Sequence, residues 1–363
     1  MRDIEYMRLA VQLAKSGIGQ TTPNPHVGAV VVNNNQIVGM GAHLLPGKEH
    51  AEVYALNMAG EKAKDSTLYV TLEPCSHYGK TPPCVNLIIE KQVKRVVVGM
   101  KDPNPKVCGK GIKSLEEAGI NVEVGVLESE AEQLNTYFKF YMENKIPYVT
   151  LKNAMSLDGK IATATGESKW ITGEIARLDS HFYRYSHDAI LVGVGTIIKD
   201  NPSLTNRFNK APKNPIRIVL DRNLRTPLDS RIILDNQAET WIITNTNVPQ
   251  DKKVEYSDKN CKIIPLNYDV NNEIDSILKF LGEKGVTSLF VEGGASINAS
   301  FLRERKFNQM ITYLSPKVIG GTLSPGPFGG TGINKINEVV ELNIISIENT
   351  GEDIKIVSEP KSI

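Results

Sequence analysis

The chain of 363 residues, with 40% hydrophobic and 23% charged residues, has the composition of a folded globular protein and the length of about two domains. Its formal net charge of +1 argues against nucleic acid or an anionic membrane as an electrostatic partner. No apolar run approaches the ~20 residues that span a bilayer, and the mixed charges of residues 1–5 predict no secretory leader. Four cysteines are too few for a disulfide scaffold, so we expect a cytoplasmic protein.

The first 145 residues alternate predicted strands and helices. Ile4, Met7, Val11 and Ala14 recur at helical spacing, which predicts an amphipathic helix over residues 3–16. Further helices are expected near residues 50–60 and 85–91. This alternation predicts an α/β domain in which helices pack on a sheet. Its strands are predicted at residues 27–33, 36–42, 68–72, 93–99 and 122–126.

The second part of the chain repeats the α/β pattern without repeating the sequence. Residues 128–145 begin acidic and become aromatic before Pro147, which predicts a helical connector. We therefore expect two domains, residues 1–145 and 146–363. Strands of the second domain are predicted at residues 148–153, 189–194, 216–220, 240–244, 288–291 and 310–313.

Three residues of the first domain form a candidate metal site. His50-Ala51-Glu52 is followed, after a strand, by Pro74-Cys75 and then Cys84. H-x-E followed by P-C-x-x-C is the signature of zinc nucleobase deaminases, in which the Glu is a general acid/base and not a ligand. We predict that His50, Cys75 and Cys84 bind zinc and that Glu52 transfers protons. The eight residues between the two cysteines depart from the usual two, although Pro82 and Pro83 favour a helix that starts near Cys84.

Other interpretations of these residues remain open on the pattern alone. Cys108, in a glycine-containing turn, is the rival third sulfur, and Cys261 is expected to be a free thiol. A nucleic-acid-editing deaminase would share the same three ligands, but it should have a basic, aromatic face. A purely structural zinc site would need a fourth ligand, and none stands at a convincing spacing.

The second domain has no G-x-G-x-x-G fingerprint for a dinucleotide. It does have strand–glycine junctions suited to phosphate binding, at residues 193–196, 292–295 and 320–332. On that pattern alone, ordinary turns between strands and helices explain these glycines equally well.

Several longer segments resemble one family. Residues 74–84, together with residues 22–30 and the Asp102-Pro103-Asn104-Pro105 segment, resemble the bifunctional deaminase/reductase family of riboflavin biosynthesis. The eight-residue insert is that family's own form of the cysteine motif. Residues 151–162, 168–173, 200–205 and 292–294 extend the resemblance into the second domain. It implies a cytidine-deaminase-like α/β/α sandwich followed by a dihydrofolate-reductase-like α/β domain.

The resemblance also implies two sets of site residues. In the deaminase, substrate contacts are expected from Asn24, His43, His77 and Lys80. In the reductase, Lys152 and Asp200 are expected near the reacting centre. The residues expected to contact NADPH are Ala154, Trp170, Thr196, Asp200 and the segment 294–300, which begins with Gly294, Ala295 and Ser296. The residues expected to contact the reductase substrate are Ser168, Arg184, Leu204, Arg207 and Glu292.

The implied activity is a pair of consecutive reactions. The first is the zinc-dependent hydrolytic deamination of 2,5-diamino-6-(5-phosphoribosylamino)pyrimidin-4(3H)-one. The second is the NADPH-dependent reduction of the ribosyl side chain of 5-amino-6-(5-phosphoribosylamino)uracil to ribityl. We expect a small phosphorylated pyrimidine as the substrate, no nucleic-acid or membrane partner, and a homo-oligomer.

Overall fold

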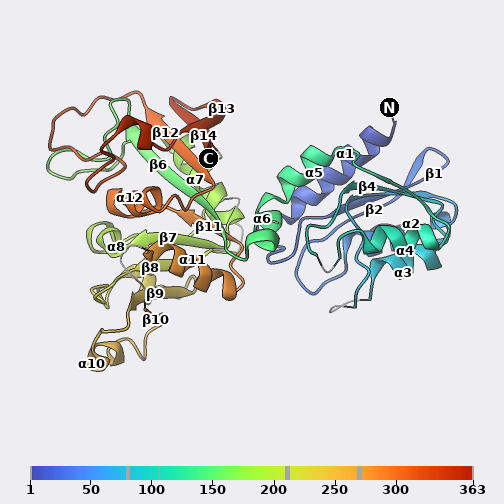
Figure 1. Ribbon diagram of the computed structural model, residues 1–363, viewed down its shortest axis with the longest axis horizontal. Helices are drawn as coiled ribbons and strands as arrows, with labels where there is room; N and C mark the ends of the chain where they lie inside the picture. The colour runs from blue at the N-terminus through green and yellow to red at the C-terminus, as the bar shows by residue number, and fades with distance from the viewer. Residues whose placement is uncertain (1, 79–81, 106, 209–212, 268–271, 362–363) are drawn as a thin grey trace. The chain divides into compact units, whose positions relative to one another are not determined.

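The computed structural model describes residues 2–78, 82–105, 107–208, 213–267 and 272–361. The chain divides into two compact units, Met1–Lys145 and Ile146–Ile363 (Figure 1). Within the described residues, no helix combines the length and apolar character needed to cross a membrane.

The first unit is built on a mixed sheet. In the part of this unit that the structure describes, the sheet has five strands in the order β2-β1-β3-β4-β5. β1 pairs antiparallel with β2 and β3, whereas β3, β4 and β5 run parallel, so β3 and β4 end at the same edge. The strands are β1 (Gly28–Asn33), β2 (Gln36–Ala42), β3 (Thr67–Leu72), β4 (Arg95–Met100) and β5 (Asn121–Val124).

Helices cover both faces of this sheet. Because side chains alternate along a strand, Val30 of β1 packs against Met7 of α1, whereas Val31 packs in the other core with Leu56 of α2. The predicted α/β/α sandwich is therefore confirmed. Its helical segments are α1 (Arg2–Ala14), η1 (Lys15–Gly17), α2 (Ala51–Ala59), η2 (Gly60–Ala63), α3 (Cys84–Glu90), α4 (Lys110–Glu117), α5 (Glu128–Leu134) and α6 (Thr136–Asn144).

The expected connector at 128–145 is wrong in its first half. α5 packs against α1 and β4, and its Ala131 is fully buried in the core of the first unit. Only α6, which has no fully buried residue, leads on toward the second unit. The acidic residues that suggested a connector form the solvent face of an amphipathic helix.

The approach of α2 to β2 is unusually close. A Cβ atom on Gly39 would lie 2.0 Å from the carbonyl oxygen of Ala55, and one on Gly41 would lie 2.3 Å from that of Ala51. Both distances exclude any side chain, so glycine is required at these positions. The contact fixes the start of α2, which carries His50 and Glu52.

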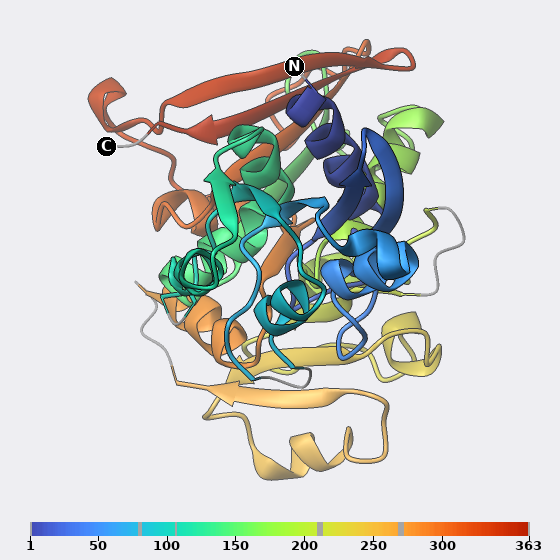
Figure 2. The same cartoon turned by 90° about the vertical axis from the view of Figure 1, so that its right-hand side faces the viewer.

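The second unit has a larger sheet. Over its described residues, nine strands lie in the order β10-β9-β8-β7-β11-β6-β12-β14-β13. The strands from β10 to β12 are parallel, and β13 and β14 form an antiparallel ribbon at one end (Figure 2). The strands are β6 (Tyr148–Ser156), β7 (Ala189–Gly193), β8 (Ile216–Leu220), β9 (Thr240–Asn245), β10 (Lys262–Leu266), β11 (Ser288–Val291), β12 (Gln309–Ser315), β13 (Leu342–Thr350) and β14 (Asp353–Pro360).

This sheet also has a core on each face. Leu151 packs with α11 and α12 on one face, whereas Ile190 and Tyr313 pack with α7, α8 and α9 on the other. β10, β13 and β14 were not expected from the sequence, because they lie at the sheet ends and lack a strong apolar run. The helical segments are α7 (Glu174–Ser186), α8 (Val194–Asp200), α9 (Arg231–Leu234), α10 (Gln250–Val254), α11 (Glu273–Glu283), α12 (Ala295–Arg303) and η3 (Ile336–Glu338).

His187 is a polar residue inside the second core. It is fully buried, its Nδ1–H donates to the Tyr183 carbonyl at 2.8 Å, and its Nε2 accepts from the Thr150 hydroxyl at 3.0 Å. Burial lowers the pKa of His187 to about 4, despite opposing effects of the Tyr183 carbonyl and Asp188. The imidazole is thus neutral in the folded protein.

This burial predicts a pH-dependent loss of stability. The unfolded chain binds a proton at His187 near the ordinary pKa of about 6.5, whereas the folded protein does not until about pH 4. The contribution of neutral His187 to the free energy of unfolding is therefore complete above pH 6.5. It is lost as the pH falls toward 4, which lowers the free energy of unfolding by ~3 kcal/mol. Urea unfolding of the wild type and His187→Gln at several pH values measures the difference, and parallel pH profiles would contradict the assignment.

Candidate active sites

The three predicted metal ligands come together from separate elements of the first unit. His50 is the N-cap residue of α2, Cys75 follows β3, and Cys84 is the first residue of α3. The His50 Nδ1 lies 3.2 Å from the Cys84 Sγ and 3.5 Å from the Cys75 Sγ. All three ligand atoms lie within 4.8 Å of one another. Bonds of about 2.0–2.3 Å around a tetrahedral zinc ion place its ligand atoms roughly 3.5 Å apart, so these residues fit zinc.

The two cysteine side chains hydrogen-bond to each other, and this bond shifts their pKa values in opposite directions. The hydrogen bond from Cys84, opposed by burial, lowers the pKa of the Cys75 thiol to about 4. The bond with Cys75 and burial raise the pKa of Cys84. The backbone N–H of Cys84 also donates to the Cys75 Sγ at 3.3 Å. Cys75 is therefore held as a thiolate, which is the form of cysteine that binds metal.

Glu52 lies beside the three ligands. It is the second residue of α2, directly after Ala51. It is 3% exposed, and burial, with a smaller effect from the Cys75 thiolate, raises its pKa to about 7. A carboxyl group with this pKa can both accept and release a proton near neutral pH.

The expected substrate residues of the deaminase lie near this cluster where they are described. His43 is buried, its Nδ1–H donates to the Glu49 carbonyl, and its Nε2 accepts from the Asn24 side chain at 3.0 Å. Its ring centroid is 5.4 Å from that of His50. His77 is exposed, and Lys80 lies outside the described residues.

Glu73, which directly follows β3 and lies two residues before Cys75, was not singled out from the sequence. Its carboxylate is 2% exposed and accepts hydrogen bonds from the backbone N–H groups of Asp102, Gly109, Gly111 and Ile112. It thereby ties the segment after β4 to the start of the Cys75 loop. The signal was an acidic residue directly after an apolar strand, where a carboxylate needs compensation.

The two other cysteines lie outside the cluster. Cys108 is exposed and Cys261 is half-buried in the second unit. Within the described residues, the side chains grouped so that they could bind a metal ion are those of His50, Cys75 and Cys84.

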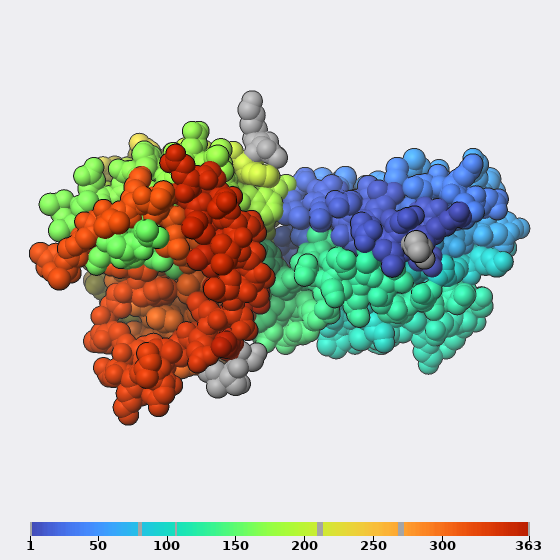
Figure 3. Space-filling view, turned by 90° about the horizontal axis from the view of Figure 1, so that it is seen from above, coloured from blue at the N-terminus to red at the C-terminus, as the bar shows by residue number. Residues whose placement is uncertain are grey.

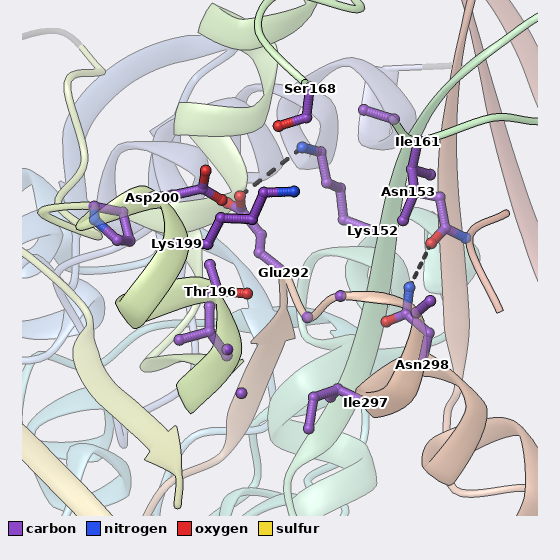
Figure 4. Close-up of a pocket in the computed structure, with 18 of the residues that line it drawn as sticks. Lys152, Asn153, Ile161, Ser168, Thr196, Lys199, Asp200, Glu292, Ile297 and Asn298 are labelled. Atoms are coloured by element: carbon purple, nitrogen blue, oxygen red, sulfur yellow. Dashed lines mark hydrogen bonds and ion pairs between the residues drawn. The ribbon is translucent and has the colours of Figure 1, made fainter. Parts of the chain in front are cut away.

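A large cavity of about 1240 Å³ opens along the carboxyl edge of the second sheet. It exceeds the 300–1,000 Å³ of typical ligand pockets, which suits a site for two ligands. β6, β11, β7 and β8 are adjacent and parallel, so their carboxyl ends share this edge. Lys152, Thr196 and Glu292 are among the lining residues labelled in Figure 4. Every expected reductase residue lines the cavity: Lys152, Ala154, Ser168, Trp170, Arg184, Thr196, Asp200, Leu204, Arg207, Glu292, Gly294, Ala295 and Ser296.

Glu292 forms the charged centre of this cavity. Arg184 binds it with two hydrogen bonds, at 2.6 and 2.9 Å, and the Lys152 Nζ lies 3.8 Å away (Figure 4). Burial opposes ionisation of Glu292, but Arg184 and Lys152 outweigh it and lower the pKa of Glu292 to about 2. Burial lowers the pKa of Lys152, Glu292 raises it, and Arg184 lowers it further.

Arg184 has little capacity left for a substrate phosphate. Its remaining guanidinium nitrogen donates to the Thr205 carbonyl at 3.0 Å. Arg207 is exposed at the cavity and, in the described part of the chain, has no ion-pair partner. The two arginines expected to share one ligand thus differ: one holds Glu292, and the other is available to an anion.

At two glycines that line the cavity, the backbone is accessible to a bound ligand. Gly294 is the N-cap of α12, and no atom lies within 4 Å of the place where its Cβ would be. The same holds for Gly195 at the start of α8. At the cavity mouth, Trp170 is 65% exposed and its ring stacks on the Arg177 guanidinium, 4.5 Å away. These features fit a dinucleotide, whose pyrophosphate needs close backbone approach.

Two further lining residues, Asn153 and His181, were not singled out from the sequence. Asn153 accepts a 2.8 Å hydrogen bond across the cavity wall from Asn298 of the expected segment 294–300 (Figure 4), and His181 lies on α7 one turn before Arg184. Burial and Arg184 lower the pKa of His181 to about 4, so its imidazole is neutral. Their residue types carry no recognisable motif, so only packing brings them here.

Comparisons with known proteins match both units. Residues 1–100 match the cytidine and deoxycytidylate deaminase zinc-binding region, and residues 147–356 match the RibD C-terminal domain. Riboflavin biosynthesis protein RibD of Bacillus amyloliquefaciens is 51% identical over 98% of this chain and 96% of its own length. The protein of the same name from Aquifex aeolicus is 47% identical over 98% of this chain and 97% of its own.

Two solved structures have a similar fold over nearly the whole chain. RibD of Acinetobacter baumannii has a TM-score of 0.89 at 36% identity and covers 99% of both chains. A diaminohydroxyphosphoribosylaminopyrimidine deaminase/5-amino-6-(5-phosphoribosylamino)uracil reductase of Thermotoga maritima has a TM-score of 0.88 at 36% identity, with the same coverage.

The fold and the two sites define an enzyme that combines a zinc-binding deaminase domain with a reductase domain. The chain belongs to the RibD family, the bifunctional deaminase/reductases of riboflavin biosynthesis. The expectation of this family is confirmed, and the nucleic-acid-editing alternative is not favoured.

Proposed function

We propose that the two activities reside in separate units, deamination in residues 1–145 and reduction in residues 146–363. The gathering of His50, Cys75 and Cys84 in one unit, and of Lys152 and Glu292 in the other, carries this proposal. The proposed substrates are 2,5-diamino-6-(5-phosphoribosylamino)pyrimidin-4(3H)-one for the first unit and 5-amino-6-(5-phosphoribosylamino)uracil for the second. The Thermotoga maritima structure carries the names of both activities.

In the deaminase, His50, Cys75 and Cys84 would hold zinc, with a fourth position left for water. Zinc supplies Lewis acidity and lowers the pKa of a water molecule at that position toward ~7. Glu52 accepts the proton of the attacking water and delivers it to the departing amine, so ammonia leaves. Its burial next to the ligands, with a pKa of about 7, supports this role.

The substrate of the deaminase would be oriented by Asn24 and His43. Their mutual hydrogen bond at 3.0 Å holds both side chains in one arrangement beside His50. Asn135 supports that arrangement, since its side chain bonds both the N–H and the carbonyl of His26. His77 and Lys80 are proposed at the outer end of the substrate, where a lysine suits the phosphate as a point charge.

In the reductase, NADPH would lie along the carboxyl edge of the sheet and supply the hydride. Thr196 and the start of α12 at Gly294, Ala295 and Ser296 would bind its phosphates. Ala154, Trp170 and Asp200 would complete the cofactor contacts. The open space at Gly195 and Gly294 supports this placement.

The reductase substrate would bind where β6 and β11 end. Lys152 and Asp200 are proposed at the reacting carbon, with the Lys152 ammonium held by Glu292. Glu292, fixed by Arg184, would accept hydrogen bonds from the substrate. Ser168 and Leu204 would line its site, and Arg207 would bind its phosphate, since a guanidinium binds phosphate bidentately.

We also propose a cytoplasmic homo-oligomer. Four free cysteines suit a reducing compartment. β13 is an edge strand that exposes Ile344, Ile345 and Ile347 at 57–64%, and the C-terminal residues lie at the surface (Figure 3). An exposed apolar edge is typical of an interface between copies. Sedimentation equilibrium should give a multiple of 40.0 kDa, and a monomer at micromolar concentration would contradict this.

The ligand assignment predicts unequal effects at the cysteines. Cys84→Ser should remove most of the zinc and the deaminase activity, because it deletes one of three ligands. Cys108→Ser is the matched control and should retain both, since this thiol is exposed and outside the cluster. Metal analysis of the purified proteins measures the effect. Full zinc content in the Cys84 variant would disprove the assignment.

Separate sites also predict separable activities. Glu52→Gln should keep zinc and lose ammonia release by roughly 10²–10⁴-fold, because an amide cannot accept the proton. Lys152→Ala or Asp200→Ala should block NADPH oxidation while ammonia release continues and the deaminated intermediate accumulates. Ammonia and nicotinamide absorbance are followed separately. Loss of both activities in one folded variant would favour a shared site.

A further inference from the structure

Tyr313 lies where the reductase cavity meets the core of the second unit. It is on β12, next to β6, and is 1% exposed, yet its side chain lines the cavity. The Lys152 Nζ is 5.9 Å from the centroid of its ring. An ammonium group at this distance from an aromatic face is attracted by the ring quadrupole. Tyr313 is therefore the aromatic neighbour of the lysine proposed to act in reduction.

The phenol of Tyr313 is fixed by two further elements. Its hydroxyl donates to the Asp179 Oδ2 of α7 at 2.6 Å, and the Lys355 Nζ of β14 lies 2.9 Å from the same oxygen. Lys355 in turn lies over the Tyr183 ring, 5.0 Å from its centroid. Lys355, Asp179 and Tyr313 thus form a chain of contacts that runs from the C-terminal hairpin to Lys152.

This chain of contacts leaves Tyr313 unable to act as an acid. Burial and the bond to Asp179 raise the pKa of Tyr313 far above its usual range. Its one O–H is already donated to a carboxylate, so no proton is available to a substrate. What Tyr313 offers to the cavity is the face of its ring, in a fixed orientation.

The charges around Lys152 explain why a fixed ring face matters. Glu292 on β11 favours its ammonium form, and Arg184 on α7 opposes it. His181, also on α7, is neutral, because burial and Arg184 lower its pKa. Burial itself favours the neutral amine. Glu292 also accepts the two Arg184 hydrogen bonds, so the aromatic face is a second attraction on the Lys152 ammonium.

We infer that Tyr313 is a positioning residue for reduction: its ring, held through Asp179 and Lys355, keeps the Lys152 ammonium protonated and in place. The inference rests on the proposed role of Lys152 in the reductase step. Loss of a desolvated cation–π contact corresponds to about a 30-fold effect, or ~1.5 pH units.

The test compares Tyr313→Leu, which removes the ring, with Tyr313→Phe, which keeps it, in the full-length protein. NADPH oxidation is measured with the deaminated pyrimidine from pH 6 to 10. Tyr313→Leu should lower kcat about 10-fold or more and move the alkaline limb about one pH unit lower, because the ammonium form loses a stabilising contact. Tyr313→Phe keeps the ring but loses its bond to Asp179, so both effects should be smaller than in Tyr313→Leu. NADPH affinity, measured by direct titration, and ammonia release should not change.

Two further variants test whether the alkaline limb of the pH profile reports the titration of Lys152 and whether a packing defect alone shifts it. Lys152→Arg carries a guanidinium that does not titrate in this range, so its profile should lose the limb. Phe290→Leu removes a fully buried ring from the same core without touching Lys152. It should lower stability and leave the limb where it is. If Tyr313→Leu does not fold, Asp179→Asn, which loosens the ring without a cavity, should shift the limb in the same direction.

The outcomes separate two kinds of failure. An unmoved limb in Tyr313→Leu, or in Asp179→Asn where that variant replaces it, would overturn the positioning role. So would additive losses in a Lys152→Ala/Tyr313→Leu double variant, because coupled residues should not lose independently. Undiminished NADPH oxidation in Lys152→Ala alone would overturn the inference as well, and would place the error in the proposed function of Lys152.

Discussion

A carboxylate taken out of water must be compensated, and in each unit one such carboxylate organises the active site. Glu73 is compensated by four backbone N–H groups, so it draws the segment after β4 against the loop of Cys75. Glu292 is compensated by Arg184 of α7 and Lys152 of β6. These contacts hold α7 close to β6 at the carboxyl edge of the second sheet.

The two forms of compensation have different chemical consequences. Backbone dipoles around Glu73 hold a loop in shape and add no net charge near the sulfurs. Cations around Glu292 create a charged centre in which Arg184 is committed to the carboxylate and Lys152 is held by a weaker contact at 3.8 Å. That difference leaves Lys152 free to respond to its other neighbours, including the Tyr313 ring.

The C-terminal hairpin is part of the reductase site through this second centre. β14 pairs with β12 and carries Lys355, which binds Asp179 beneath the cavity. A segment far from the catalytic residues in the sequence therefore supports the side chain of Lys152. The same hairpin exposes apolar side chains on the edge strand β13.

The sequence by itself determined the α/β class, most of the central strands and the residues of the metal site. Long apolar runs are local signals for strands, and the H-x-E and P-C motifs, read with the family's own eight-residue insert, indicated His50, Cys75 and Cys84 as ligands. The tertiary structure alone decided that α5 belongs to the first core, that Arg184 binds Glu292, and that Asp179, Tyr313 and Lys355 meet. The polar contacts among them join residues 108 to 176 positions apart, and pairings of single polar side chains at such separations leave no periodic pattern in the chain.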